Sequence, residues 1–258
     1  MITEKISFPA RDNRIIDGLL YKTSVGQLGT CVFIHGLGGY KEQEHIVATA
    51  TALALAGIST LCIDATDDIA HGPDAVVGAT PTKRLYNIED AVAYTLEQSW
   101  GEGVLIVGGH SLGGIAAGTL AGSGKYPVKG AVLMAPVVSG DIQWANRDVA
   151  LLEEWQKMGT IPRQFATRPN ETFQLGYALV DDARHYSLLR DADTLRTMPV
   201  LMVVGTDDTS TPAAHVKLLA HAIGEQGTYV EIPNTKHNFR GQEPAVAEAV
   251  TNWIEKNF

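Results

Sequence analysis

Short aliphatic runs separated by helical patterns constrain the fold of this chain more than any other feature. The sequence opens with a hairpin pattern, and six further runs follow it. The segments are Ile2–Phe8, Arg14–Lys22, Thr30–Ile34, Ser59–Ile63, Val104–Val107, Lys129–Met134, Val200–Val204 and Thr228–Ile232. Most of the later runs are continuously apolar, as expected for strands that helices cover on both faces. The pattern therefore predicts a sheet of eight strands.

Helical patterns fill the gaps between these runs. Apolar residues spaced three or four apart over 85–96 predict a helix, with Thr82 in position to cap it. Thr211 and Pro212 precede a second pattern as a cap followed by a proline at the first helical position. A third stripe over 246–253 predicts a C-terminal helix. Strands that alternate with helices indicate a doubly wound α/β fold with a mostly parallel sheet.

One segment interrupts this alternation. Residues 140–196 contain no convincing strand pattern and are rich in aromatic residues. Because a structureless loop of this length is improbable inside a compact domain, we expect a small helical insertion over the carboxyl edge of the sheet. The predicted domains are a core of residues 1–139 and 197–258 and a lid of residues 140–196.

Composition excludes several classes of function. The 258-residue chain has a formal net charge of −9 and no basic run, which argues against binding to nucleic acid. No apolar run is long enough to span a membrane. The polar N-terminus does not resemble a signal peptide, so a cytoplasmic location is expected. Cys31 and Cys62 lie in apolar runs, and we expect buried free thiols.

A glycine cluster surrounds a single serine directly after the run Val104–Val107. Gly109, His110, Ser111, Leu112 and Gly113 match the pattern G-x-S-x-G, and small residues typical of a buried helix follow. This strand–turn–helix context identifies a nucleophile elbow, in which the serine occupies a sharp turn that excludes side chains at the flanking glycines.

Nucleotide-binding loops do not fit either glycine cluster. A Walker loop needs a lysine that the elbow lacks, and the cluster Gly36–Gly39 is followed by Lys41 where a dinucleotide fingerprint needs glycine.

A serine nucleophile needs a base and an orienting acid. Where the serine lies on an elbow of this kind, the order along the chain is serine, then acid, then histidine. The last two predicted strands end in these residue types. Val200–Val204 leads to Asp207 and Asp208, and Thr228–Ile232 leads to His237. His237 is the predicted base, since the other histidines precede the serine or lie in helices or the insertion. Position alone leaves both aspartates open as the acid.

With these residues in order, nearly the whole chain resembles the α/β-hydrolase fold family. The resemblance implies Asp208 as the acid, because Gly205, Asp208 and Pro212 match the family register, with Asp207 in reserve. The loop that begins at His35 is similar to the HG-x-G loop of esterases and lipases. It implies an oxyanion hole formed by the backbone N–H groups of Leu37 and Leu112.

The resemblance also has a departure. Many relatives carry a glycine-rich loop after the fourth strand, where this chain keeps Asp64 but loses most of the glycines. The predicted catalytic residues Ser111, Asp208 and His237 are unaffected by this difference. The wall of the nearby pocket and the subfamily of the chain are not determined by the sequence.

Within the family, the chain resembles feruloyl (cinnamoyl) esterases with a lid and monoacylglycerol-lipase-like hydrolases. The resemblance implies a serine carboxylic-ester hydrolase that needs no cofactor or metal. An aromatic wall in the insertion would suit aromatic or short-chain esters, and also an aromatic polyester such as poly(ethylene terephthalate). The proposed wall residues are Trp144, Trp155, Phe165, Phe173 and Tyr177. Aromatic residues in a small helical insertion more often form its own core, which is the alternative for these five residues.

Other functions remain open at this stage. The main enzymatic alternatives are a monoacylglycerol lipase and a thioesterase. A ligand-binding receptor or scaffold is the alternative outside catalysis, since a fold does not fix a function.

Overall fold

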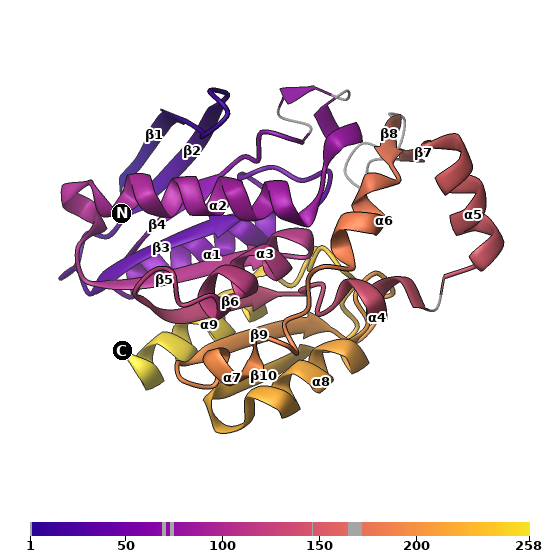
Figure 1. Ribbon diagram of the computed structural model, residues 1–258. Coiled ribbons are helices and arrows are strands. Elements are labelled where there is room, and N and C mark those ends of the chain that lie inside the picture. The colour runs from indigo at the N-terminus through magenta and orange to yellow at the C-terminus, as the bar shows by residue number, and fades with distance from the viewer. Residues whose placement is uncertain (1, 69–70, 73–74, 146, 165–171) are drawn as a thin grey trace.

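The eight predicted strands form one sheet (Figure 1). The computed structural model describes residues 2–68, 71–72, 75–145, 147–164 and 172–258. The strands are β1 (Ile2–Pro9), β2 (Ile15–Lys22), β3 (Gly29–Ile34), β4 (Ile58–Ile63), β5 (Val104–His110), β6 (Val128–Met134), β9 (Val200–Gly205) and β10 (Gly227–Ile232). Their order is β1-β2-β4-β3-β5-β6-β9-β10. β1 and β2 pair antiparallel with each other, β2 pairs antiparallel with β4, and the remaining pairs are parallel. The predicted mostly parallel sheet is confirmed.

Helices cover both faces of this sheet. The helices α2 (Pro81–Leu96), α3 (Leu112–Gly122) and α8 (Ala213–Ile223) pack on one face, and α1 (Glu44–Leu55) and α9 (Glu243–Asn257) pack on the other. In β3, Val32 and Ile34 join the first core, whereas Cys31 and Phe33 join the second. Strands buried on both faces need apolar residues at every position, which explains the continuous runs in the sequence.

Short 3₁₀ turns complete the connections of the sheet. They are η2 (Ala75–Gly78), η3 (Ser99–Gly101) and η4 (Gly224–Gln226).

The insertion between β6 and β9 is mainly helical but also contains a β-hairpin. Its elements are α4 (Gly140–Ala145), α5 (Val149–Met158), β7 (Thr160–Gln164), β8 (Thr172–Gly176), α6 (Ala178–Ala183) and α7 (Ala192–Leu195). The expectation that this segment has no strand is therefore wrong. The hairpin strands have five residues each, and Pro162 lies within β7, where it lacks a donor for a sheet hydrogen bond. Such short segments give a weak pattern in the sequence.

Two predicted helix caps differ from those in the structure. Thr80, not Thr82, is the N-cap of α2, and its hydroxyl accepts a hydrogen bond from the backbone N–H of Lys83. Thr82 lies inside the helix and donates its hydroxyl hydrogen to Asp182. Thr211 makes no cap for α8, because its hydroxyl contacts Ala135 and Asp208 instead. Thr82 and Thr211 are thus engaged in other contacts, whereas α2 keeps a local cap at Thr80.

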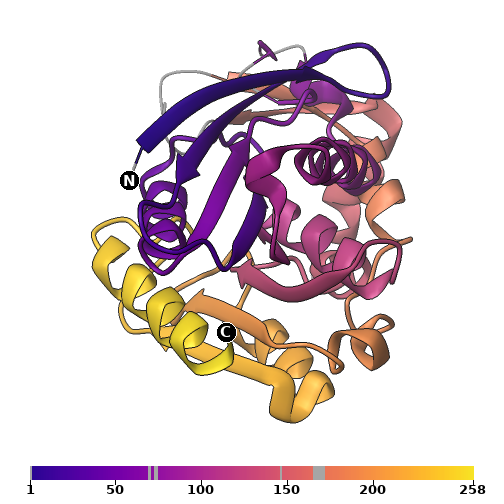
Figure 2. The same cartoon turned by 90° about the vertical axis from the view of Figure 1, so that its left-hand side faces the viewer.

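The two chain ends lie at the amino edge of the parallel strands, as Figures 1 and 2 show. Ile2 pairs with Lys22, close to the start of β4. Phe258 packs against Trp253, with ring centroids 5.5 Å apart, near Gly130 at the start of β6. The insertion begins after the opposite, carboxyl end of β6.

The two cysteines are buried free thiols, as predicted. Burial raises the pKa of the Cys31 thiol. None of the helices in the described part of the chain is both long and apolar enough to cross a bilayer.

Candidate active site

Ser111 occupies a strained turn between β5 and α3. Its backbone has φ 56° and ψ −115°, an uncommon conformation for a residue with a side chain. A Cβ atom on Gly109 would lie 2.2 Å from the carbonyl oxygen of Gly113, and one on Gly113 would lie 2.4 Å from that of Ile34. The glycines on either side of the serine are therefore required by close backbone contacts, as the elbow pattern predicts.

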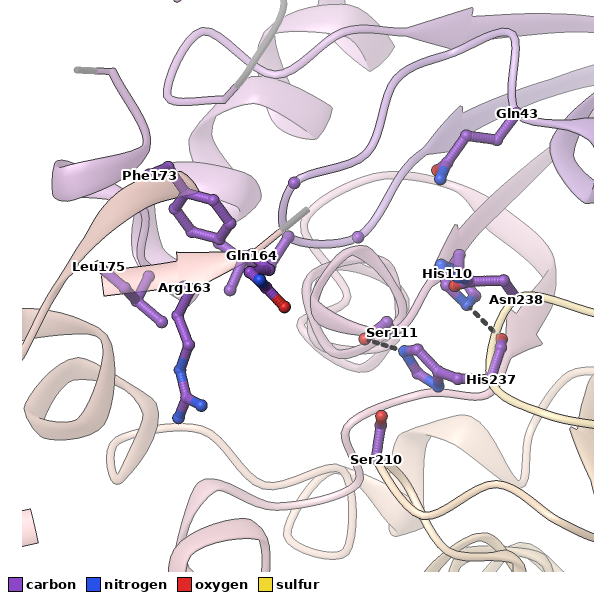
Figure 3. Close-up of a pocket in the computed structure, with 13 residues that line it drawn as sticks. Gln43, His110, Ser111, Arg163, Gln164, Phe173, Leu175, Ser210, His237 and Asn238 are labelled. Carbon is purple, nitrogen blue, oxygen red and sulfur yellow. Dashed lines mark hydrogen bonds between the residues drawn. The ribbon is translucent and has the colours of Figure 1, made fainter. Parts of the chain in front are cut away.

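His237 connects Ser111 to Asp208 through two hydrogen bonds. Because an ionised carboxylate only accepts, Nδ1–H of His237 donates to Oδ2 of Asp208 at 2.7 Å. Nε2 of His237 then accepts from the hydroxyl of Ser111 at 2.9 Å (Figure 3). This arrangement allows a proton to pass from the serine hydroxyl to the imidazole when the oxygen attacks an electrophile.

The carboxyl of Asp208 is buried and held in its ionised form. Its Oδ1 accepts hydrogen bonds from the backbone N–H groups of Ser210 and Thr211. Burial raises the pKa of this carboxyl, but the hydrogen bond and charge of His237 and the bonds from Thr211 outweigh burial and hold it below its usual value. Asp208 therefore stays a carboxylate that can orient His237 and stabilise its protonated form.

Asp207 lies outside this arrangement. Its side chain is exposed, and its Oδ1 accepts a hydrogen bond from the hydroxyl of Thr206. The structure thus brings only one of the two neighbouring aspartates to His237.

Two backbone N–H groups, those of Leu37 and Leu112, belong to residues close to Ser111. Leu112 is the first residue of α3, where N–H groups have no intrahelical acceptor. Leu37 lies in the loop after β3, which approaches the elbow so closely that a Cβ on Gly36 would lie 2.9 Å from that of Ser111. Within the described residues, no acceptor is bonded to the N–H of Leu37 or of Leu112. Both donors are thus available to a developing negative oxygen.

A buried ionic cluster holds the loop that carries Leu37. The backbone N–H of Gly38, which has φ 65°, donates to Oδ2 of Asp68 at 2.9 Å. The guanidinium of Arg84 binds Asp68 and also Asp67, the latter at 3.0 Å. All three charged side chains are fully buried. Arg84 belongs to α2, so the cluster fixes the loop after β3 to a helix far along the chain.

Buried histidines lie behind His237. His110 packs at a ring-centroid distance of 4.7 Å from His237 and 4.4 Å from His45. Its Nε2 lies 3.0 Å from the backbone carbonyl oxygen of His237 and donates its hydrogen to it. Burial, followed by the nearby charges of His45 and His237, lowers the pKa of His110 well below its usual value. His110 therefore stays neutral and ties the base loop to the elbow.

A cavity of about 280 Å³ opens beside Ser111. Polar groups of Gln43, His110 and Asn238 lie on the side of His237, and the hairpin strands β7 and β8 form the other side (Figure 3). The lining residues are Gly36, Leu37, Gly38, Gln43, His110, Ser111, Arg163, Gln164, Phe173, Leu175, Ser210, His237 and Asn238. The cavity can thus hold a small molecule with its reactive atom at Ser111.

Of the aromatic residues proposed as a wall, Phe173 alone lines the cavity among those described. Trp155 packs edge-on against both Trp144 and Tyr177, at centroid distances of 5.9 Å and 5.7 Å. Its indole N–H donates to the carbonyl oxygen of Leu175. These three residues are part of the insertion's own packing, which corrects the expectation of a wall. Phe165 lies outside the described residues.

Sequence reasoning missed the part of the cavity lining that lies outside the motifs. Arg163, Gln164 and Leu175 belong to the hairpin, whose strands gave no clear pattern. Gln43 and Asn238 stand next to the oxyanion loop and His237, so proximity to those motifs was the one signal that could have found them. Within the described residues, no group of three histidine, cysteine or acidic side chains is arranged to hold a metal ion.

Comparison with known proteins identifies similar sequences and folds. Residues 31–249 match the sequence model of the alpha/beta hydrolase family. Among curated proteins, no match was found. The structure of Est1E from Butyrivibrio proteoclasticus with bound ferulic acid has a TM-score of 0.84 and 21% identity, over 98% of each chain. A putative hydrolase from Agrobacterium vitis S4 has a TM-score of 0.79 and 18% identity, over 98% of this chain and all of the other. At these identities, the structural likeness shows a shared fold.

Proposed function

The chain belongs to the alpha/beta hydrolase family, and from this premise we propose that it is a serine carboxylic-ester hydrolase. The observation that carries the proposal is the chain of hydrogen bonds from Ser111 through His237 to Asp208, at 2.9 Å and 2.7 Å. This set of residues is what acyl transfer through a serine requires.

In the proposed reaction, the hydroxyl oxygen of Ser111 attacks the ester carbonyl while His237 takes its proton. The N–H groups of Leu37 and Leu112 stabilise the oxyanion of the tetrahedral intermediate. The intermediate collapses to an acyl-enzyme, and His237 gives the proton to the departing alcohol. Water then attacks the acyl-enzyme with His237 again as base, which releases the acid and restores Ser111. Asp208 keeps the imidazole in the required tautomer throughout.

The proposed substrates are aromatic or short-chain esters of the kind that feruloyl esterases hydrolyse. A cavity of about 280 Å³ favours a small acyl group over a long chain. Phe173 and Leu175 offer an aromatic and an aliphatic surface to such a group. The similar fold of Est1E, whose structure contains ferulic acid, supports the same class. Aromatic polyesters such as poly(ethylene terephthalate) are an extension of this proposal.

Residues 140–196 act in this proposal as a lid over a core formed by residues 1–139 and 197–258. The support is that the hairpin β7–β8 supplies one whole side of the cavity, with Arg163, Gln164, Phe173 and Leu175. Substrate preference is then set mainly by the insertion, and the chemistry by the core.

Hydrolysis of an ester panel by the wild type and by Ser111→Ala tests the proposal. The panel contains 4-nitrophenyl acetate, butyrate and laurate, monoolein, methyl ferulate and bis(2-hydroxyethyl) terephthalate. We expect the wild type to hydrolyse the aromatic and short-chain esters and Ser111→Ala to lose about 10⁴-fold or more in kcat. Ser210→Ala is the matched control, because Ser210 also lines the cavity but its hydroxyl is not bonded to His237.

Other outcomes would redirect the proposal. A preference for laurate and monoolein would assign a lipase instead. Equal rates for the wild type and Ser111→Ala would remove Ser111 as the nucleophile. Binding of esters without turnover would indicate a receptor.

A further inference from the structure

One cation lies on the cavity side of the lid hairpin. Arg163 of β7 stands opposite Phe173 of β8, and Ile161 stands opposite Leu175. Directly opposed residues of an antiparallel pair share a face. Ile161, Phe173 and Leu175 are buried, so this face of the hairpin is turned toward the cavity and the core. Arg163, which is exposed, is the charged member of this otherwise buried and apolar face.

The guanidinium of Arg163 has no carboxylate partner in the part of the chain that the structure describes. By contrast, Arg11 and Arg84 each bind two carboxylates. Figure 3 shows the side chain of Arg163 extending beside the open space in front of Ser111. Among the described residues, therefore, no ion pair has to break before Arg163 binds a ligand.

The surroundings of the cavity are also basic. A second hollow of about 660 Å³ adjoins the first and shares Ser210, His237 and Asn238 with it. Lys236 and Arg240 line this second hollow, and Asp207 is the single acidic residue among the described lining of either hollow. The chain as a whole has a net charge of −9. A local excess of positive charge on an acidic protein attracts anions to this opening.

We propose that the ester substrate carries an anionic group, of which a carboxylate is the best match, and that Arg163 binds it while Ser111 attacks the ester carbonyl. This inference rests on the proposed hydrolase function and narrows its substrate class to half-esters and related ester acids. A planar guanidinium binds a carboxylate through two parallel hydrogen bonds. The apolar part of the substrate then lies against Phe173 and Leu175.

Pairs of esters that differ in charge but hardly in shape test this inference. Methyl 4-carboxybenzoate and methyl 4-carbamoylbenzoate place the carboxylate or the neutral amide on the acyl side. 4-Carboxyphenyl acetate and 4-carbamoylphenyl acetate place them on the alcohol side. Each kcat/KM is divided by the rate constant for alkaline hydrolysis of the same ester, which removes the difference in intrinsic reactivity. The ratio of the anionic to the neutral ester in each pair is the quantity to compare.

For the wild type at low salt, we expect a preference of about fivefold or more for the anionic ester in at least one pair. Arg163→Gln should abolish this preference, and Arg163→Lys should retain part of it. Lys157→Gln is the matched control, because it removes an equal charge from an exposed site on α5 of the same insertion, and it should keep the wild-type ratio. About 0.5 M salt should reduce the ratio through screening.

The inference fails if the wild type shows no preference in either pair, or if Arg163→Gln keeps the wild-type ratio. If Arg163→Gln keeps the wild-type ratio, Arg163 would instead act as a charge that prevents other strands from pairing with the edge of the hairpin. Failure of the proposed function itself is a separate result, since it would appear as the absence of Ser111-dependent hydrolysis of the neutral esters.

Discussion

At the scale of single residues, the neighbouring carboxylates Asp207 and Asp208 differ in burial and in hydrogen-bond partner. Asp208 is buried and bonded to His237, whereas Asp207 is exposed and bonded to Thr206. We therefore expect Asp208→Asn to lower kcat by about 10³- to 10⁴-fold, because the amide favours the wrong tautomer of His237. Asp207→Asn is the matched control and should stay within about twofold of the wild type.

Steady-state hydrolysis of 4-nitrophenyl butyrate measures both variants. Similar losses in the two variants would contradict the assignment of Asp208 as the acid. Thermal unfolding should accompany the kinetics, since Asp208 also accepts two backbone hydrogen bonds that stabilise its loop.

At the scale of elements, the loop after β3 that carries Leu37 is held by contacts from outside its own strand and helix. Asp68→Asn removes the charge that binds both Gly38 N–H and Arg84. We expect kcat to fall by about tenfold with little change in KM, because a displaced loop weakens the donor of Leu37 in the transition state alone. Affinity for a boronic acid, which mimics the tetrahedral intermediate, should fall in parallel.

Asp182→Asn provides the comparison for Asp68→Asn. Asp182 also anchors an element, by accepting bonds from the backbone and hydroxyl of Thr82. Within the described residues, no hydrogen bond or ion pair joins it to the loop that carries Leu37. It should change stability without changing the affinity for the boronic acid. A loss of stability alone in Asp68→Asn would show that the buried cluster is structural only.

Elements whose patterns are local were predictable, and those that depend on tertiary contacts were not. The strands of the main sheet are buried on both faces, so their aliphatic runs are visible in the sequence. Thr80 and Thr82 are both suitable caps, and a contact with Asp182 decides between them. The residues proposed for the triad were predictable because they follow a known order along the chain. Arg163 and Leu175 line the cavity from a hairpin whose strands are short and contain Pro162, so its sequence pattern is weak.

At the scale of the whole molecule, buried histidines make stability depend on pH. Burial lowers the pKa of His45 from 6.5 to about 3, and it lowers the pKa values of His35 and His110 well below that ordinary value. At pH values between the lowered folded-state pKa and 6.5, the unfolded chain binds protons at these histidines that the folded chain does not. Their contribution to stability is therefore complete above pH 6.5 and is lost as the pH falls toward the folded pKa values.

Each such histidine adds about 1.4 kcal/mol per pH unit to the slope of the unfolding free energy between about pH 6 and pH 5. His45→Asn should lower this slope by about 1.4 kcal/mol per pH unit, which corresponds to one bound proton fewer in the unfolded chain. Urea unfolding at several pH values measures the slope, and an unchanged slope in His45→Asn would contradict a buried neutral His45.

The position of the chain ends has a practical consequence. Ile2 and Phe258 lie at the amino edge of the strands, and Ser111 lies at the carboxyl end of β5. A linker attached at Phe258 would therefore leave from the side opposite the cavity. Tethered in this way to a bead or a membrane support, the molecule would direct its opening away from the support, toward dissolved or particulate substrate.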